Sequence, residues 1–253
     1  MKFHVIIPAR LASSRLPEKP LKLIGNKPMV VRVVDQALLS GAETITVATD
    51  DEKIVQVCQQ FGCDVVMTKK EHPTGTDRLS EAVTALELKD DDIVVNVQGD
   101  EPLIPPSIIS EVAEFLASHP DCEIATAAHE IHDLEEFLNP NVVKVVLDNQ
   151  NRAITFSRAP IPWPRDDFRK DPSSLPSDLH PLRHIGLYAY KVSFLKQFPQ
   201  WGMSHLEKHE SLEQLRALSY GVRIAVKELD SALPAGVDTQ EDLDRIRKVF
   251  EEN

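Results

Sequence analysis

Three cationic side chains lie close together near the start of the sequence. Arg10, Arg15 and Lys19 fall within ten residues, directly after an apolar run, although the net charge of the chain is 28 − 40 = −12. Guanidinium and ammonium groups are strong donors to phosphate oxygens. A turn at Ala12-Ser13-Ser14 would add backbone N–H donors. The segment therefore predicts a triphosphate-binding loop, and the alternative is a solvated basic loop.

Two aspartates stand where a metal ion could bind. Asp100 closely follows an apolar run, and Gly99 before it would let the backbone approach a ligand closely. Asp238 precedes the last helical pattern of the chain. Carboxylates near phosphates suit Mg²⁺, and two of them beside a basic loop form a constellation for nucleotidyl transfer. The alternative for each is an aspartate that caps a helix or forms a turn.

Short apolar runs alternate with helical patterns in the first hundred residues. Periodicity predicts strands at 3–7, 44–48, 64–67 and 93–97, and helices at 29–39, 52–61 and 77–88. This alternation is typical of an α/β, Rossmann-like, mostly parallel sheet with helices on both faces. Because ligands bind beyond the carboxyl ends of such strands, one site should be surrounded by the loops 8–20, 49–52, 68–76 and 98–105.

The rest of the chain reads differently. Strands are predicted at 124–128, 142–147, 153–156 and 184–190, with a hairpin turn at 149–151. Prolines and charges without periodicity predict a long loop at 159–181. A helix at 206–219, a strand at 223–226 and a helix at 239–250, capped by Thr239, complete the expectation. Residues 1–253 are thus interpreted as one α/β domain with a β-rich insertion at about 124–190.

Composition excludes several classes of protein. A net charge of −12 opposes binding to nucleic acid or to anionic membranes. The first apolar run is too short for a signal peptide or a membrane span. Cys58, Cys63 and Cys122 have no metal-binding spacing and are interpreted as reduced thiols. We therefore expect a cytoplasmic protein.

Motifs along the whole chain carry a resemblance to a known family. The segment 8–20 is similar to the opening signature of sugar-nucleotidyl transferases. Six further motifs follow it in order and together resemble the cytidylyltransferases that act on Kdo (3-deoxy-D-manno-octulosonate). They are Pro73-Thr74-Gly75-Thr76-Asp77-Arg78, Val95-Asn96-Val97-Gln98-Gly99-Asp100-Glu101-Pro102, Phe156-Ser157-Arg158, Arg183-His184-Ile185-Gly186, Glu213-Gln214-Leu215-Arg216 and Gly236-Val237-Asp238-Thr239.

The resemblance implies an activity and a set of residues. The activity is transfer of CMP from CTP to Kdo with release of pyrophosphate, which activates Kdo for lipopolysaccharide biosynthesis. It implies Mg²⁺ held by Asp100 and Asp238, with Lys19 and Arg10 joining them in catalysis. It also implies a homodimer, with 124–190 serving sugar binding and dimerisation. The implied CTP-binding residues are Arg10, Ser13, Arg15, Lys19, Thr76, Arg78 and Gln98. The implied Kdo-binding residues are Arg158, His184, Tyr188, Glu213 and Gln214.

Alternatives stay open at this stage. A related acidic sugar, such as 8-amino-Kdo or a sialic acid, could replace Kdo without any change in the nucleotide loop. A non-catalytic nucleotide-binding subunit could keep the fold, since fold alone does not prove function. The chain departs from the family's pattern at Asp77, where glutamate is often expected, and the stretch 165–181 aligns with no motif.

Overall fold

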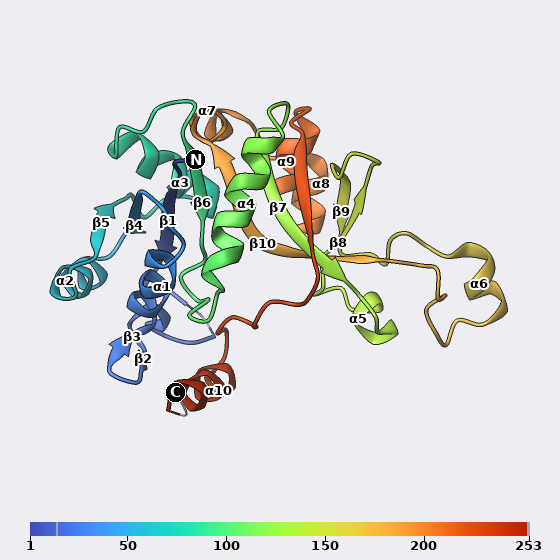
Figure 1. Cartoon of the computed structure of the whole chain (residues 1–253), viewed down its shortest axis with the longest axis horizontal. Coiled ribbons are helices and arrows are strands. Elements are labelled where there is room, and N and C mark those ends of the chain that lie inside the picture. The colour runs from blue at the N-terminus through green and yellow to red at the C-terminus, as the bar shows by residue number, and fades with distance from the viewer. Residues whose placement is uncertain (14, 252–253) are drawn as a thin grey trace.

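A nine-stranded sheet forms the centre of the molecule in the computed structural model, which describes residues 1–13 and 15–251 (Figure 1). Seven strands form its main path, in the order β11-β7-β10-β6-β1-β4-β5, and β8 and β9 branch from β10. The bounds are β1 His4–Ala9, β4 Thr44–Thr49, β5 Asp64–Met67, β6 Ile93–Asn96, β7 Ile124–Glu130, β8 Lys144–Leu147, β9 Ala153–Ser157, β10 Leu182–Lys191 and β11 Ile224–Leu229.

The parallel part of the sheet confirms the expectation from the sequence. β6, β1, β4 and β5 pair in parallel, and β11 pairs in parallel with β7. β10 runs antiparallel to both β6 and β7, so it joins the two parallel groups. The carboxyl ends of β1 and β6 therefore lie side by side, which brings together the loops that follow Ala9 and Asn96.

Helices cover both faces of this sheet. One core cluster packs α1 (Met29–Leu38), α2 (Glu52–Gln60) and α4 (Pro106–Ser118) against one face. A second packs α3 (Gly75–Ala85), α7 (Val192–Gln197) and α9 (Gln214–Ser219) against the other. α4 and α7 were not predicted. Their apolar residues are nonetheless buried, and α4 begins with a proline at its first turn, as helices often do.

The expected helix at 206–219 is wrong in one respect. The chain forms two short helices, α8 (His205–Glu210) and α9, instead of one. The break falls at Ser211, whose φ of 52° is left-handed and cannot continue a helix. α8 begins with a capping box in which Ser204 and Glu207 satisfy each other's backbone N–H groups. The angle between the helices thus depends on local polar groups that periodicity does not reveal.

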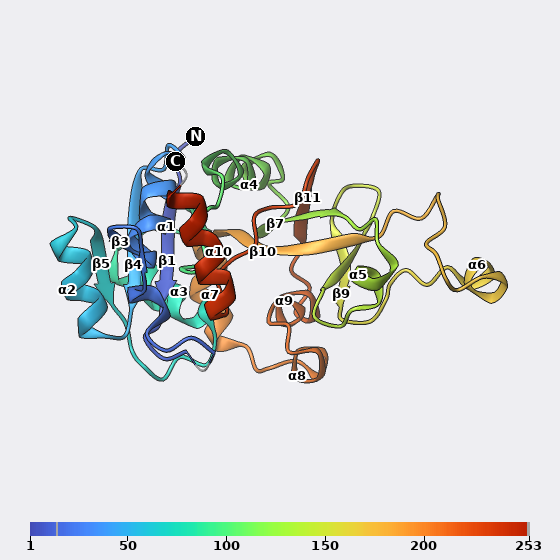
Figure 2. The same ribbon diagram turned by 90° about the horizontal axis from the view of Figure 1, so that it is seen from below.

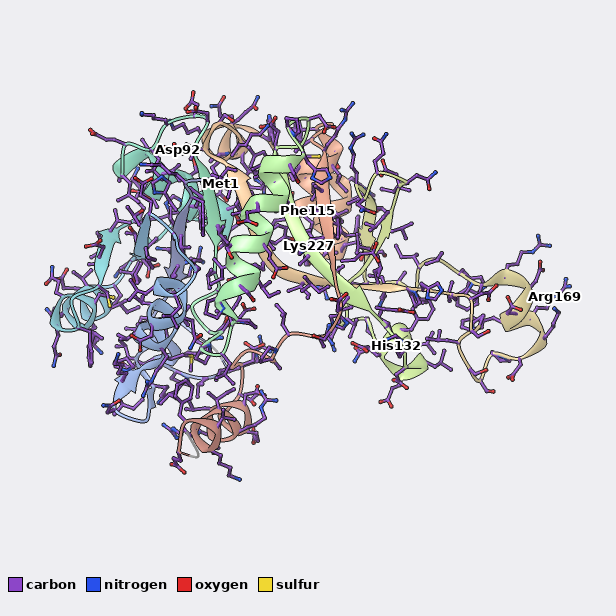
Figure 3. The ribbon with its side chains drawn as sticks, viewed as in Figure 1. Met1, Asp92, Phe115, His132, Arg169 and Lys227 are labelled. Atoms are coloured by element: carbon purple, nitrogen blue, oxygen red, sulfur yellow. The ribbon has the colours of Figure 1, made fainter. Side chains whose placement is uncertain are left out.

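The segment beyond β9 leaves the body of the molecule. Figures 1 and 2 both show it as an arm that ends in α6 (Arg165–Lys170). Arg169 marks the far end of the arm in Figure 3. The long loop expected at 159–181 therefore contains one short helix, whose Phe168 is buried in a small cluster with Phe137 of α5 (Leu134–Leu138). The hairpin of β8 and β9 is confirmed as antiparallel.

The C-terminal helix returns to the N-terminal loop. α10 (Gln240–Glu251) shares an apolar cluster with Leu16 and Met29, and Arg247 Nε donates to the Leu23 carbonyl at 2.9 Å. This packing places Asp238 beside the basic loop although more than two hundred residues separate them. The remaining short elements are η1 Lys19–Leu21, β2 Leu23–Ile24, β3 Lys27–Pro28 and η2 Phe198–Gln200. Among the described helices, none has the length and apolar character needed to cross a bilayer.

Candidate active site

The basic loop lines a pocket at the carboxyl edge of the sheet. The pocket encloses about 300 Å³ and is lined by Arg10, Ala12, Ser13, Arg15, Lys19, Gln98, Gly99, Asp100 and Asp238, among others. Ser13 Oγ accepts a hydrogen bond from the Leu16 N–H at 3.3 Å, which fixes the turn of the loop. Ser14, the third residue of the predicted turn, lies outside the described residues. The site predicted for a triphosphate is thus a concave, cation-lined surface.

Gly99 is needed where the ends of β1 and β6 meet. A Cβ atom at this position would lie 2.8 Å from the backbone carbonyl oxygen of Pro8. Any larger residue would push apart the basic loop and the loop that carries Asp100. The glycine therefore lets two neighbouring strand ends place cations and a carboxylate in one pocket.

Lys19 lies between the two predicted metal ligands. Its Nζ is 2.5 Å from Asp100 Oδ2 and 3.1 Å from Asp238 Oδ1. Arg15 Nη2 is 3.1 Å from Asp238 Oδ2. Burial lowers the pKa of the Lys19 ammonium, but the two carboxylates outweigh burial and the pKa is raised overall. The ammonium group is therefore held firmly charged at the centre of the pocket.

Asp238 does not cap the last helix. The capping role falls to its neighbours, because Asp242 Oδ2 accepts the N–H groups of Asp238 and Thr239, and Thr239 Oγ1 accepts the Asp242 N–H. The Asp238 carboxylate is left to pair with cations of the basic loop. Asp100 is no cap either, since α4 begins six residues later. The structure thus excludes the capping alternative for both aspartates.

Arginines fasten the neighbouring loop. Arg10 Nη2 donates to the carbonyls of His72 and Thr74, at 2.9 and 3.3 Å. Arg78 is fully buried, and its guanidinium binds Asp50 Oδ2 at 2.6 Å and Thr68 Oγ1. Arg78 therefore braces the loops after β4 and β5 in this structure. It reaches nucleotide only if this network rearranges.

The first turn of α3 explains the departure from the family's pattern. Thr74 caps the helix by accepting the Asp77 N–H at 3.2 Å, and its hydroxyl donates to Asp77 Oδ2 at 2.6 Å. The Asp77 carboxylate thus accepts the Thr74 hydroxyl at the start of α3, and aspartate is compatible with this N-terminus. Thr76, in the same turn, is buried, with 2% of its surface exposed.

A second pocket meets the first at the paired aspartates. It encloses about 470 Å³, and its lining includes Asp100, Asp238, Glu101 and His184. Gln98 also joins the two sides, because its Nε2 lies 3.5 Å from the Gly186 carbonyl oxygen. Any group bound in this second pocket would therefore lie next to a phosphate bound in the first.

Glu101 is a residue that sequence reasoning missed. Burial, followed by the Asp100 carboxylate, raises the pKa of Glu101 to about 7. Its Oε2 atom is buried and has no hydrogen-bond partner among the described residues. The position beside Asp100 was its only signal in the sequence.

His184 lies in an apolar setting within the second pocket. Its ring packs against Phe156 and Tyr188, with centroids 4.9 and 5.3 Å away, and its Nε2 lies 3.0 Å from Thr126 Oγ1. Burial lowers the pKa of His184 to about 3. The imidazole is therefore neutral at pH 7, so it can contribute a hydrogen bond to a ligand but no positive charge. Tyr188 is buried, and burial raises its pKa well above the usual value.

Glu213 and Gln214 begin α9 beside a third pocket. This pocket encloses about 460 Å³ and also borders Gly75 of α3 and its N-cap residue, Thr74. Burial raises the pKa of Glu213, and hydrogen bonds with Thr76 offset part of that rise. The last residue of the motif, Arg216, forms a buried two-point ion pair with Glu207 of α8, at 2.8 and 2.5 Å. Arg216 thus fixes α9 on α8.

Arg158 is held at the end of β9. Its backbone N–H and its Nε donate to Oε2 and to the carbonyl oxygen of Glu210, at 2.8 and 2.6 Å. Its Nη1 donates to the Pro140 carbonyl at 3.1 Å.

The predicted nucleotide residues Arg10, Ser13, Arg15, Lys19 and Gln98 share the first pocket with both aspartates. Of the predicted sugar residues, His184 lines the second pocket, and Glu213 and Gln214 line the third. Arg158 follows β9, and Tyr188 packs against His184 without lining either pocket.

The donors present fit a magnesium ion. Asp100 and Asp238 converge on one ammonium group, which shows that their carboxylates can share a single cation. Mg²⁺ is commonly bound by one or two carboxylates, with substrate phosphates and water completing its shell. No cluster of three or more histidine, cysteine or acidic residues that could hold a metal by itself occurs in residues 1–13 and 15–251. The site therefore suits a metal that arrives with a triphosphate better than a resident structural metal.

Fold and site define a nucleotidyl transferase built on an open α/β sheet, and the comparisons with known proteins agree. The sequence pattern of the cytidylyltransferases matches residues 4–224. A 3-deoxy-manno-octulosonate cytidylyltransferase of Pseudomonas fluorescens (strain SBW25) is 56% identical over 248 residues, which are 98% of each chain. One of Pseudomonas syringae pv. tomato is 53% identical over 249 residues, again 98% of each. The chain belongs to the 3-deoxy-manno-octulosonate cytidylyltransferase family.

Solved structures extend the comparison to three dimensions. A CMP:2-keto-3-deoxy-manno-octonic acid synthetase complexed with CTP superposes with a TM-score of 0.89 at 38% identity, covering 100% of this chain and 99% of that one. A cytidylyltransferase of Leptospira borgpetersenii superposes with a TM-score of 0.63 at 15% identity, covering 100% of this chain and 87% of that one. The second likeness shows the shared fold alone.

Proposed function

We propose that the chain transfers CMP from CTP to Kdo and releases pyrophosphate, which activates Kdo for lipopolysaccharide biosynthesis. The observation that carries this proposal is the placement of Lys19, Asp100 and Asp238 together in a cation-lined pocket. A second pocket, which His184 of the predicted sugar residues lines, borders the same aspartates. The full-length likeness to relatives that bear this name supports the choice of sugar.

On the nucleotide side, Arg10, Arg15 and Lys19 hold the triphosphate. Lys19 then neutralises charge that develops on the departing pyrophosphate, because its ammonium already lies at the centre of the pocket. Ser13 and Gln98 line the same pocket and offer neutral hydrogen bonds. Thr76 and Arg78 fix the loop beside the cytosine and ribose. Catalysis rests mainly on positioning and on charge neutralisation, as in other phosphoryl transfers.

On the sugar side, Arg158 pairs with the carboxylate of Kdo. His184, Tyr188, Glu213 and Gln214 hydrogen-bond its hydroxyl groups, and neutral His184 acts as one of these polar contacts. This arrangement presents the anomeric hydroxyl to the α-phosphorus of CTP, opposite the leaving pyrophosphate. A sugar without the carboxylate would leave Arg158 unmatched, which favours acidic substrates.

Asp100 and Asp238 would hold Mg²⁺ together with the triphosphate. When bound there, the ion supplies charge neutralisation and lowers the pKa of the attacking hydroxyl. Both carboxylates pair with Lys19, and Asp238 also pairs with Arg15, so these cations would compete with a metal ion for the same carboxylates. Binding of CTP and of the metal should therefore be coupled.

We also propose that the chain forms a homodimer through the 124–190 subregion and that it is located in the cytoplasm. The projecting arm supports the first, because its Trp163 is 58% exposed. The free thiols Cys58, Cys63 and Cys122 support the second. Light scattering on the purified chain would test the dimer, and a monomeric mass at micromolar concentration would refute it.

Release of pyrophosphate from CTP and Kdo tests the main proposal. The reaction is run with and without Mg²⁺, beside controls that lack sugar or contain 8-amino-Kdo or a sialic acid. Release that requires both Mg²⁺ and Kdo is expected. Release with only another acidic sugar would change the assigned substrate. No release with any sugar, from folded protein, would refute catalysis.

A further inference from the structure

A lysine is buried in the strand that lies between two of the candidate sugar-binding residues. Lys144 of β8 has no exposed surface. Its neighbours along the chain are the apolar residues Val143 and Val145. In the sheet it pairs with Ser157 of β9, next to Arg158, and with Arg183 of β10, next to His184. A fully buried lysine is rare unless its charge is satisfied.

Three backbone carbonyls surround the Lys144 ammonium. Nζ donates to the carbonyl oxygens of Asn139 at 3.0 Å, Val142 at 2.6 Å and Arg158 at 2.8 Å. Three acceptors match the three N–H donors of a charged ammonium group, whereas a neutral amine could serve only two of them. Lys144 therefore remains protonated, even though burial, as the largest cause, lowers its pKa.

These contacts reach Arg158 from two directions. Lys144 binds the carbonyl oxygen of Arg158 directly. It also fixes the turn 139–142, whose Pro140 carbonyl accepts Nη1 of the Arg158 guanidinium. Glu210 provides the third hold, through Nε and the backbone N–H of Arg158. Arg158 Nη2 has no acceptor among the described residues, so this end of the fork is available to a substrate anion.

The charges of this cluster favour an anion. Lys144 and Arg158 carry two positive charges and Glu210 one negative charge, so the three residues together leave one positive charge. The Lys144 ammonium group is occupied by three carbonyls inside the protein, so it does not bind substrate directly. It acts through the residue that it orients, because a guanidinium binds a carboxylate well only when its planar fork is correctly aligned.

We propose that Lys144 is a positioning residue that aligns Arg158 for the carboxylate of the acidic sugar. The inference rests on the proposed sugar-binding role of Arg158. It extends that role to a residue that touches no substrate and lies within the strand core. It predicts that loss of Lys144 weakens the binding of the sugar, while the binding of CTP, most of whose candidate residues share the first pocket, is unaffected.

Steady-state kinetics of variants in the full chain test this. In Lys144→Met, the KM for Kdo should rise about tenfold or more, as expected when hydrogen bonds of a charged group are lost, while the KM for CTP stays within about twofold. Val145→Ala is the matched control, because it removes buried volume from the same strand and leaves the ammonium network intact. An equal rise in both variants would make Lys144 merely structural and would overturn the proposal. Lys144→Gln, which keeps amide donors, replaces Lys144→Met if that variant does not fold.

A double-mutant cycle with Arg158→Ala gives the decisive result. If Lys144 acts through Arg158, the double variant should have the same KM for Kdo as Arg158→Ala alone. Multiplying effects of the two substitutions would overturn the proposal, as would a normal KM for Kdo in Arg158→Ala. The wild-type chain is assayed in parallel for pyrophosphate release from CTP and Kdo. No pyrophosphate release by the wild-type chain would refute the proposed function itself, independently of any variant.

Discussion

The two sides of the site are built in different ways. On the nucleotide side, the ends of β1 and β6 and the loop before α10 place the groups of the first pocket, and Gly99 lets the backbones meet. The buried ion pair of Arg78 with Asp50 braces only the loops beside that pocket. On the sugar side, buried charged side chains hold the groups in place, as Arg216 does with Glu207 and Lys144 with Arg158. Backbone geometry is fixed by the fold, whereas a side-chain network depends on each partner. The sugar side should therefore be the more sensitive to single substitutions, and the side on which specificity can change.

The largest effect on stability should come from breaking the ion pair on the sugar side. Arg216→Met leaves the Glu207 carboxylate buried without its partner. We expect a loss of about 3–5 kcal/mol in the free energy of unfolding, measured by urea denaturation. The KM for Kdo should rise more than the KM for CTP. Arg216→Met/Glu207→Gln should regain part of the loss, and a loss below about 1 kcal/mol in the single variant would contradict the contrast.

On the nucleotide side, a substitution should affect turnover and leave the fold intact. Asp100 is partly exposed and does not cap a helix. Asp100→Asn should lower kcat by about a hundredfold or more, as for loss of a key electrostatic group, with an unchanged thermal transition. Asp64→Asn, the same change at an exposed position at the start of β5, is the control and should leave kcat unchanged. Near-normal turnover in Asp100→Asn would remove this residue from the mechanism.

A smaller effect is expected at Lys19, where a substitution should weaken the binding of CTP and strengthen the binding of a metal ion. Lys19→Ala should raise the KM for CTP about tenfold, because a charged donor to phosphate is lost. The same change frees Asp100 and Asp238 from their ammonium partner, so the variant should bind Mn²⁺ more tightly than wild type when no nucleotide is present. Titration followed by electron paramagnetic resonance measures this. Equal or weaker Mn²⁺ binding in the variant would show that Lys19 does not compete with the metal.

The smallest effect should be a pH dependence on the sugar side. The pKa of His184 is lowered to about 3 in the folded protein, from an ordinary 6.5. Between these values the unfolded chain takes up a proton that the folded chain does not, so His184 makes stability fall as the pH drops below 6.5. The slope is at most about 1.4 kcal/mol per pH unit.

His184→Gln removes this contribution. Urea denaturation at pH 7 and pH 5 should therefore show a smaller loss in the variant than in wild type. Glu101 acts in the opposite direction, because its raised pKa of about 7 makes stability fall as the pH rises above about 4.5. The difference between variant and wild type, which cancels the Glu101 contribution, is thus the quantity to measure. Identical losses would show that His184 takes up its proton equally well in both states.

The sequence by itself determined the strand and helix pattern of the first hundred residues and the position of the basic loop. It could do so because short apolar strands and amphipathic helices have different periods, and because parallel strands bring their carboxyl ends to one edge. The ordered motifs determined the family. They also identified Asp100 and Asp238 as candidates, but could not distinguish either from a helix cap.

Only the tertiary structure decided how distant residues combine. Asp238 reaches Lys19 because α10 packs on the N-terminal loop, and no local pattern encodes that contact. The break at Ser211, the neutral state of His184 and the burial of the Lys144 ammonium depend in the same way on tertiary packing. Sequence periodicity reports which face of an element is apolar. It does not report which polar groups come into contact once the faces have packed, and those contacts determine the charges of the groups in this site.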